Sequence, residues 1–542
     1  MELYYLISAI NPRAVWPGFL TVILAAPAFV TLGYPRSWAG SRTVDLIARY
    51  GVVILFTVAA GQFVLALLYL RYPSYYNHME ANAVVQSWLG WRGLPLYPSP
   101  TTGDIYAFPY GPALFETLGA ALWAFGPSIA ASKIPGLAAF VATPILSFVM
   151  LRRSGAKIVE AMAITAAQCF VQAGFDNEAY AYGARADVFL MLTAQGAMFA
   201  ATCRPTIANA IILGLLAGLE SNLKIHGVLY VLPAAVYFLL TSQRLAARLE
   251  NASIGFAAAL VTFSLPFLPH NVSFAEYLHY FELLSHHPLD RWLFEQNVAF
   301  AAMLILPIIP LSFRALRTIQ RGTGWFQASI IGCMAIVCII ASAEGAGPHH
   351  LLPFLPSIAW GFFVEDKRLV VSAQALTVAT RKAVLMIALV IGYSPIVLIS
   401  WQLVRLNTAN VDNVRIGLAE IENALRDKPF LKIAVGPGES VAAQELRVIP
   451  VFHGNPLPID SSAWMEFDAD GVSEERIISV LETCQVDLWL MPKGPPFSMG
   501  GQFSGPHKTQ LFSPAIREGF RASYVKIRSG QVFDTWGCKQ PR

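Results

Sequence analysis

Long apolar segments alternate with short polar ones over roughly the first four hundred residues of the chain. A membrane-spanning helix needs about 20 mostly apolar residues, and many of these segments approach that length. The candidate spans are 15–33, 50–70, 128–150, 157–175, 187–203, 206–222, 225–241, 253–269, 298–313, 325–343, 349–364 and 383–403. The pattern therefore predicts a polytopic α-helical membrane protein with about twelve spans.

Two regions depart from this pattern. The stretch 71–111 is polar although it follows an apolar segment, and residues 405–542 mix polar and apolar positions over a length sufficient for a small domain. Within the tail, 431–436 resembles a strand, Glu474–Gln485 has helical spacing, and 486–490 resembles a second strand. We therefore expect a membrane domain over 1–404, which carries the loop 71–111, and an α/β domain over 405–542.

Composition and charge agree with a membrane domain and orient it. Only 13% of the 542 residues are charged, against about 25% in soluble domains. Basic clusters such as Arg152/Arg153 and Arg244/Arg248 fall in alternate short loops, which the positive-inside rule places in the cytoplasm. The loop 71–111 and the tail then face outward, and 112–126 is expected to be a re-entrant or interfacial helix rather than a span. We expect an integral protein of the bacterial inner membrane, and a net charge of +4 makes no case for a nucleic-acid partner.

The six cysteines say little about function. Four of them lie in or beside spans, where cysteine behaves as a small apolar residue. Cys484 and Cys538 both lie in the outward tail. They either pair in an oxidising compartment or remain free thiols.

Polar residues gather at the predicted outward ends of several spans. Ionisable groups at membrane depth are costly and usually functional, so this convergence predicts a site. The candidate residues are Glu80, Tyr110, Arg185, Asp187, Lys224, His226, His349 and His350. The competing interpretation is structural for each of them: an interfacial aromatic, a helix-capping ion pair, a snorkelling lysine or packed histidines.

Each candidate residue suits a step of group transfer. Glu80, shortly after the span 50–70, can accept a hydroxyl proton as a general base. Asp187 can orient a substrate hydroxyl or hold a cation, and Lys224 can bind a phosphate as a point charge. His349 and His350 can donate to a phosphate or bind a divalent metal. The spacing of the histidines does not match a metal site, so metal binding stays an open alternative and no cofactor is predicted.

The order of several short motifs resembles the GT-C class of integral-membrane glycosyltransferases, in the branch of the protein mannosyltransferases and the aminoarabinose transferases. The matching motifs are Asn77-His78-Met79-Glu80, Gly93-Leu94-Pro95-Leu96-Tyr97, Phe108-Pro109-Tyr110-Gly111-Pro112, Arg185-Ala186-Asp187, Lys224 before Val231-Leu232-Pro233, and His349-His350-Leu351-Leu352-Pro353. The chain departs from the family where Met79 stands in place of an aspartate before Glu80, and where Gly111 replaces a proline.

The resemblance implies transfer of a sugar from a polyprenyl-phosphate donor to a glycan, lipid or protein acceptor of the cell envelope. Glu80 would deprotonate the acceptor and the anomeric configuration would invert. Lys224, Arg185, His349 and His350 would stabilise the leaving phosphate, without an obligatory metal. Two alternatives stay open: a transporter or flippase of lipid-linked sugars, which inverted repeats would favour, and a non-catalytic membrane scaffold, which would tolerate changes at Glu80.

Overall fold

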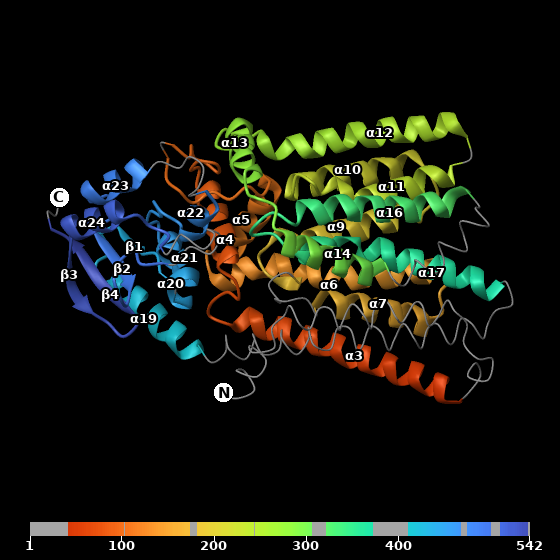
Figure 1. The fold of residues 1–542 in the computed structure, drawn as a ribbon, viewed down its shortest axis with the longest axis horizontal. Helices are drawn as coiled ribbons and strands as arrows, with labels where there is room; N and C mark the ends of the chain where they lie inside the picture. The colour runs from red at the N-terminus through yellow and green to blue at the C-terminus, as the bar shows by residue number, and fades with distance from the viewer. Residues whose placement is uncertain are drawn as a thin grey trace.

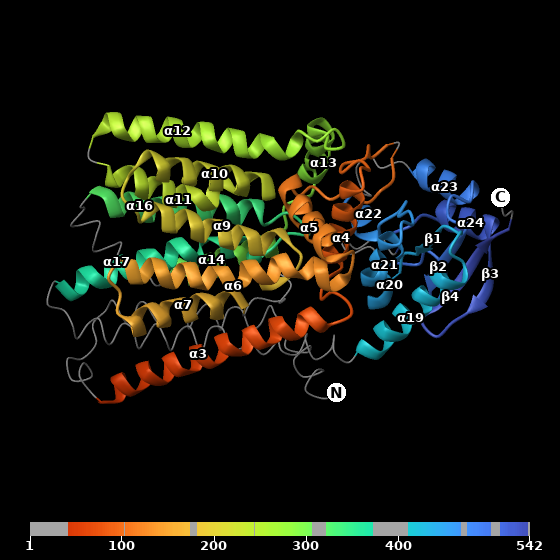
Figure 2. The ribbon, with the colours of Figure 1, turned by 180° about the vertical axis from the view of Figure 1, so that it is seen from behind.

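The computed structural model describes residues 42–101, 103–173, 181–242, 244–305, 321–371, 410–438, 440–467, 474–499 and 510–539. In these ranges ten long helices run side by side as a bundle (Figures 1 and 2). They are α3 (Arg42–Arg71), α6 (Ile129–Arg153), α7 (Ile158–Ala173), α9 (Ala186–Ala201), α10 (Ile207–Leu223), α11 (Val228–Thr241), α12 (Leu245–Ser264), α14 (Arg291–Ile305), α16 (Arg321–Ile340) and α17 (Leu355–Val371). The predicted spans 15–33 and 383–403, and the predicted boundary at residue 404, lie outside the described residues.

Two of the described helices are long and apolar enough to cross a membrane alone. They are α6 and the continuous helix Leu245–Phe267, formed by α12 with the short η1 (Leu265–Phe267). Further apolar helices of 10–17 residues lie beside them in the bundle. On α12 the side chains of Leu249, Phe256 and Leu260 are more than half exposed, as expected for a surface that faces lipid. The predicted helical architecture is therefore observed over the described residues, and the count of about twelve spans stays a prediction.

Small residues allow α12 to approach α10 closely. A Cβ atom on Gly214 would lie 2.0 Å from the carbonyl oxygen of Gly255, and one on Gly218 would lie 2.2 Å from that of Ala259. Glycines four residues apart form one face of a helix, and in lipid such faces drive helix association through close packing. The packing explains how an outer helix with few buried side chains is held in the bundle.

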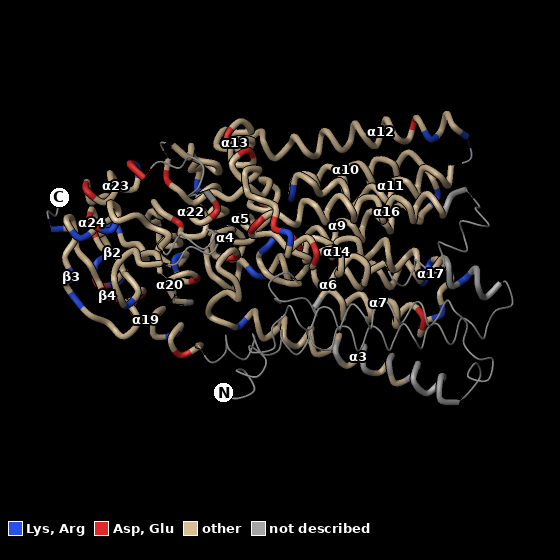
Figure 3. The backbone as a smooth tube through the Cα atoms, in the orientation of Figure 1, with Lys and Arg blue, Asp and Glu red and all other residues tan. Residues whose placement is uncertain are grey.

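Basic residues mark the bundle end that lies away from the C-terminal residues (Figure 3). The helix α6 ends there with Arg152 and Arg153 in its last turn. Lys367 of α17 donates a hydrogen bond to the carbonyl oxygen of Gly155 at 2.7 Å, so α6 and α17 end together. The positive-inside rule expects such a concentration at a cytoplasmic end.

Three shorter helices lie at the opposite end of the bundle: α4 (His78–Trp91), α5 (Pro112–Phe125) and α13 (Phe274–Ser285) (Figures 1 and 2). The helix α5 covers the segment 112–126. It has 14 residues, as many as α11 of the bundle, but it lies at the end of the bundle beside α4 (Figures 1 and 2). That the segment is a re-entrant or interfacial helix stays a prediction.

The C-terminal residues form an α/β domain beyond this end. Its helices are α19 (Val411–Asp427), α20 (Val441–Leu446), α21 (Val448–Phe452), α22 (Ser461–Phe467), α23 (Glu474–Glu482) and α24 (Pro514–Ser523). The sheet has the order β1-β2-β4-β3. Its strands are β1 (Ile433–Val435), β2 (Leu488–Pro492), β3 (Tyr524–Ser529) and β4 (Phe533–Cys538), of which only β1 and β2 are parallel.

The parallel pair is the strand–helix–strand arrangement that the tail sequence predicts. Ile433 pairs with Leu488, and α23 lies in the connection between the two strands. Cys484 and Cys538 form a disulfide that ties the turn before β2 to the end of β4. Of the two alternatives for these cysteines, pairing is therefore the one observed.

Candidate active site

Glu80 lies in the first turn of α4 with its carboxylate enclosed by donors. Asn77 caps the helix by accepting a hydrogen bond from the Met79 N–H at 2.8 Å. Glu80 Oε1 accepts from the Tyr69 hydroxyl at 2.6 Å and from the Ala184 N–H at 2.9 Å. Burial raises the pKa of Glu80, and the bonds from Tyr69 and Ala184 oppose that shift. The carboxylate thus links the loop 71–111 to the turn that precedes α9.

Lys133 is a buried cation beside Glu80 that sequence reasoning missed. It lies in α6, and its ammonium donates to the carbonyl oxygens of Tyr69, Tyr72 and Ser74 at 2.9, 2.8 and 2.5 Å. These carbonyls belong to the end of α3 and the turn after it, where backbone acceptors have no helical partner. A lone charge within the predicted span 128–150 was the available signal.

Four predicted residues form what we term the bundle-end cluster: Tyr110, Arg185, Asp187 and Lys224. Asp187 Oδ1 accepts from Lys224 Nζ at 2.7 Å, and its Oδ2 accepts from Arg185 Nε at 3.2 Å. An Arg185 Nη atom lies 3.3 Å from the Tyr110 hydroxyl, to which it donates. The cluster holds two cations and one carboxylate, so it carries net positive charge in a buried setting.

Three predicted histidines lie together beside this cluster. His226 Nε2 and His350 Nδ1 are 3.2 Å apart, so one ring donates to the other. His226 follows α10, and His350 belongs to η2 (Pro348–Phe354), as does its neighbour His349. The ring centroids of His349 and His350 lie 4.5 Å apart. Among the described residues, no group of three or more His, Cys, Asp or Glu side chains is arranged to hold a metal ion.

The backbone brings Glu80 and the bundle-end cluster to the same place. Ala184, which donates to Glu80, directly precedes Arg185. The end of the loop is held against α10, because the Ala113 N–H donates to Asn222 Oδ1 at 2.7 Å. A Cβ atom on Gly111 would lie 1.3 Å from the Asn222 carbonyl oxygen, so only glycine permits this contact. All eight candidate residues thus lie at the bundle end next to the C-terminal domain, although their roles stay predictions.

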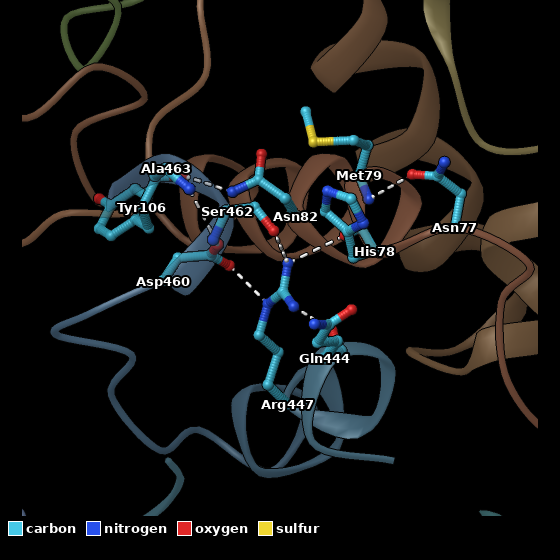
Figure 4. Close-up of polar contacts among 10 residues, drawn as sticks. All are labelled: Asn77, His78, Met79, Asn82, Tyr106, Gln444, Arg447, Asp460, Ser462 and Ala463. Carbon is cyan, nitrogen blue, oxygen red and sulfur yellow. Dashed lines mark hydrogen bonds and ion pairs between the residues drawn. The ribbon is translucent and has the colours of Figure 1, made fainter. Parts of the chain in front are cut away.

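The C-terminal domain is hydrogen-bonded to the start of α4, the helix that carries Glu80. Figure 4 shows the guanidinium of Arg447 between two parts of the molecule. Its Nε donates to Asp460 Oδ2 at 2.6 Å, and one Nη donates to the His78 carbonyl oxygen at 2.9 Å and to Ser462 Oγ at 3.0 Å. The other Nη donates to the Gln444 carbonyl oxygen. The Arg447–Asp460 pair within the domain is buried, and the hydrogen bond from Arg447 to the His78 carbonyl oxygen joins the domain to the first turn of α4.

A second contact of the domain lies close to the first. The Ser74 hydroxyl donates to Glu445 Oε2 at 2.5 Å. Burial raises the pKa of Glu445 to about 8, and the Ser74 bond opposes that shift. Ser74 and His78 flank the start of α4, so α20 and the residue after it hold both sides of the turn that leads to Glu80.

Glu466 is a third contribution of the domain that sequence reasoning missed. It lies in α22 and is half-buried. Its carbonyl oxygen accepts from His287 Nε2 at 2.8 Å. Burial raises the pKa of its carboxyl to about 7, and the charges of His287 and Arg185 oppose that shift. The Glu466 carboxyl of the tail thus lies within electrostatic range of Arg185, and nothing local in the tail sequence signalled it.

Comparison with known proteins bears on the fold. No protein-family model and no curated protein matches the chain. The crystal structure of ArnT from Cupriavidus metallidurans bound to undecaprenyl phosphate is similar, with a TM-score of 0.55 and 13% identity over 90% of this chain and 97% of that chain. ArnT in the apo state gives a TM-score of 0.53 and 14% identity over the same shares. The chain therefore shares the overall fold of ArnT, a helical bundle with a C-terminal domain, which bears out at the level of the fold the resemblance expected from the sequence.

Proposed function

We propose that this protein is a glycosyltransferase that moves a sugar from a polyprenyl-phosphate donor to an acceptor on the extracytoplasmic face of the membrane. The observation that carries the proposal is the bundle-end cluster. It places Lys224 and Arg185 on one carboxylate, next to Glu80, at the end of the bundle that the C-terminal domain covers. The likeness to ArnT bound to undecaprenyl phosphate supports a lipid-phosphate ligand for this fold.

The cluster suits the charge that develops on the leaving group. Breaking the bond between the anomeric carbon and the phosphate oxygen leaves an anionic polyprenyl phosphate. Lys224 and Arg185 supply fixed positive charge in a buried setting, where such charge acts more strongly than in water. The polyprenyl tail requires lipid, and apolar side chains cover the outer face of the bundle. His349 and His350 supply further donors to the phosphate.

Glu80 is the proposed general base. Its raised pKa brings the carboxylate closer to neutral pH as a proton acceptor. The acceptor hydroxyl must replace one of the three donors around the carboxylate, and the Tyr76 N–H at 3.2 Å is the longest of the three bonds. Direct attack of the deprotonated hydroxyl on the anomeric carbon inverts its configuration. No metal takes part in the proposed step.

The distribution of charge supports the proposed orientation. The basic end of the bundle faces the cytoplasm under the positive-inside rule, so the cluster and the C-terminal domain face outward. The disulfide between Cys484 and Cys538 suits an oxidising compartment. A reporter fused after Gly436 should be active only outside the cytoplasm, and activity inside would contradict this orientation.

A transfer assay tests the proposal. Protein in nanodiscs is incubated with radiolabelled polyprenyl-phosphate sugars and a crude envelope extract, with wild type, Glu80→Gln and Glu80→Asp side by side. We expect the Glu80→Gln variant to transfer label about 10²- to 10⁴-fold more slowly, the range for losing a general base. Glu422→Gln is the matched control, because Glu422 is exposed on α19.

The outcomes of this assay separate the three interpretations. Equal rates of transfer by wild type and Glu80→Gln would show that Glu80 is not the general base. Movement of the intact lipid-linked sugar across the bilayer without transfer would support a flippase. Absence of both, with every variant behaving as wild type, would support a scaffold.

A further inference from the structure

A groove separates the polar loop from the C-terminal domain. It has a volume of about 660 Å³ and is distinct from the bundle-end cluster. One wall comes from the end of α4 and the loop after it. The other comes from the segment 454–458 after α21, from α23 and from the residues before β1 and β2. Figure 1 shows this loop between α13 and α23, beyond the end of the bundle. The groove is defined here by Arg92, Asp104, Tyr106, Lys432, Arg476 and Gln485.

The groove is cationic. Arg92, Lys432 and Arg476 are its basic side chains, and Asp104 is its one carboxylate. Arg476 Nη2 pairs with Asp104 Oδ1 at 2.5 Å, with 24% and 35% of the two side chains exposed. Asp104 is thus paired with Arg476, and Arg92 and Lys432 form no ion pair with the described residues. A patch of this sign attracts ligands that carry negative charge.

The two walls are held at a fixed separation. The Ile105 N–H donates to the Pro458 carbonyl oxygen at 2.9 Å, and the Asp460 N–H donates to the Ile105 carbonyl oxygen at 2.7 Å. These bonds form a parallel bridge between the loop and the domain. The Tyr106 hydroxyl donates to the Pro95 carbonyl oxygen at 2.6 Å within the loop wall. The groove is therefore built into the fold and does not arise from chance contact of two surfaces.

One donor in the groove lacks an acceptor. Arg476 Nε is buried and has no hydrogen-bond partner among the described residues. An unsatisfied buried donor is costly, and guanidinium N–H groups bind carboxylate and phosphate oxygens strongly. The proline faces of the lining, with Leu94 and Leu457, add apolar area of the kind that packs against sugar rings. The lining thus combines anion recognition with a surface suited to a saccharide.

We propose that this groove binds an acidic saccharide, a glycan that carries carboxylate or phosphate groups, as part of the acceptor. Its role as acceptor site rests on the proposed function, whereas binding itself does not. Arg92 lies twelve residues after Glu80, and the helical rise makes this about 18 Å. The groove therefore holds a portion of the acceptor remote from the reacting hydroxyl, and its binding energy positions that hydroxyl.

Direct binding tests the proposal without any transfer. The full chain in nanodiscs of zwitterionic lipid is titrated calorimetrically with an oligogalacturonate, a phosphorylated malto-oligosaccharide and the unmodified malto-oligosaccharide. We expect the two acidic probes to bind and the neutral one to bind at least tenfold more weakly. Arg92→Ala and Arg476→Ala should each weaken acidic binding about tenfold or more, the effect of losing a charge-assisted hydrogen bond.

Two controls keep the result decisive. Arg528→Ala removes an exposed arginine from β3 and should leave the Kd unchanged. Asp104→Asn removes the carboxylate of the groove and should tighten acidic binding, an effect that misfolding cannot produce. Equal binding of neutral and acidic probes, an equal loss in Arg528→Ala, or displacement of the saccharide by nanodiscs of anionic lipid would overturn the proposal. Binding should survive Glu80→Gln, so failure here and failure of the transfer assay are distinguishable.

Discussion

The bundle-end cluster and the groove both gather basic side chains, but the protein treats them differently. In the cluster, Arg185 and Lys224 are 6% exposed and share Asp187. In the groove, Arg476 and Asp104 are 24% and 35% exposed, and Arg92 and Lys432 form no ion pair with the described residues. Charge in the first region is desolvated and fixed before any ligand arrives, whereas charge in the second stays in contact with water. This difference fits the two proposed roles, electrostatic stabilisation in the first region and ligand recognition in the second.

The largest expected effect comes from removing the shared carboxylate. Asp187→Asn leaves two buried cations without their partner, and breaking one side of a buried ion pair costs about 3–5 kcal/mol. We expect a loss of unfolding free energy of this size and loss of transfer, measured by denaturant titration in detergent and by the radiolabel assay. Asp412→Asn is the control, because its pair with Arg415 is exposed and should be worth about 1 kcal/mol or less. An equal loss of unfolding free energy in Asp187→Asn and Asp412→Asn would contradict a larger contribution of the buried ion pair.

The next effect concerns the contact of the C-terminal domain with α4 through Arg447. Arg447→Lys keeps the charge but cannot satisfy Asp460, Ser462 and the His78 carbonyl oxygen together. We expect kcat for transfer to fall about tenfold with little change in KM, because each lost charge-assisted bond is worth about 1.5–3 kcal/mol. Amide hydrogen exchange over 78–82 should accelerate in this variant and not in Arg528→Lys. An unchanged exchange rate with reduced kcat would show that Arg447 does not act by positioning the helix.

A smaller effect is expected from pH at the same contact. The pKa of Glu445 in the folded protein is about 8, above its usual 4.5, so the folded state binds more protons between these values. Stability of the docked domain should therefore fall as pH rises from about 4.5 to about 8. Glu80, Lys133 and Arg447 are the charged groups that face this carboxyl. Limited proteolysis at pH 6 and pH 9 measures the docking, and Glu445→Gln should flatten the dependence. A steeper dependence in that variant would assign the effect elsewhere.

The smallest expected effect is the response to salt. Interactions between exposed charges weaken as the Debye length falls, whereas buried pairs are screened much less. Raising NaCl from about 50 to 500 mM should weaken oligogalacturonate binding several-fold and change undecaprenyl phosphate binding less. Calorimetry with the two ligands on the same preparation gives the ratio. An equal dependence of the two affinities on salt would contradict the assignment of one ligand to exposed charges and the other to buried charges.

Regular elements were readable from the sequence because their signals are local. Apolar runs placed helices such as α6 and α10, and the tail pattern placed β1, α23 and β2. The convergence of Glu80, Asp187 and Lys224 was also predictable, since positive-inside counting puts all three at one membrane face. The positions of the charged residues therefore predicted that these three side chains lie near one another, which the hydropathy of the segments does not show.

The missed residues share a physical reason. Glu445, Arg447 and Glu466 act on residues more than 175 positions away, such as Ser74, His78 and His287. A single sequence has no periodic signal for such contacts. Lys133 was hidden differently, because the apolar residues around it outweigh one charge in the hydropathy of the segment. Its three carbonyl partners depend on the end of α3 lying against α6, which only the packed structure reveals.

The most direct test compares one lysine from each region in binding of undecaprenyl phosphate. Lys224→Ala and Lys432→Ala are placed in nanodiscs, and the affinity for the lipid phosphate is measured by native mass spectrometry beside wild type. The account predicts that Lys224→Ala loses binding about tenfold or more, while Lys432→Ala binds as wild type. Undiminished binding by Lys224→Ala would contradict the claim that the bundle-end cluster receives the phosphate.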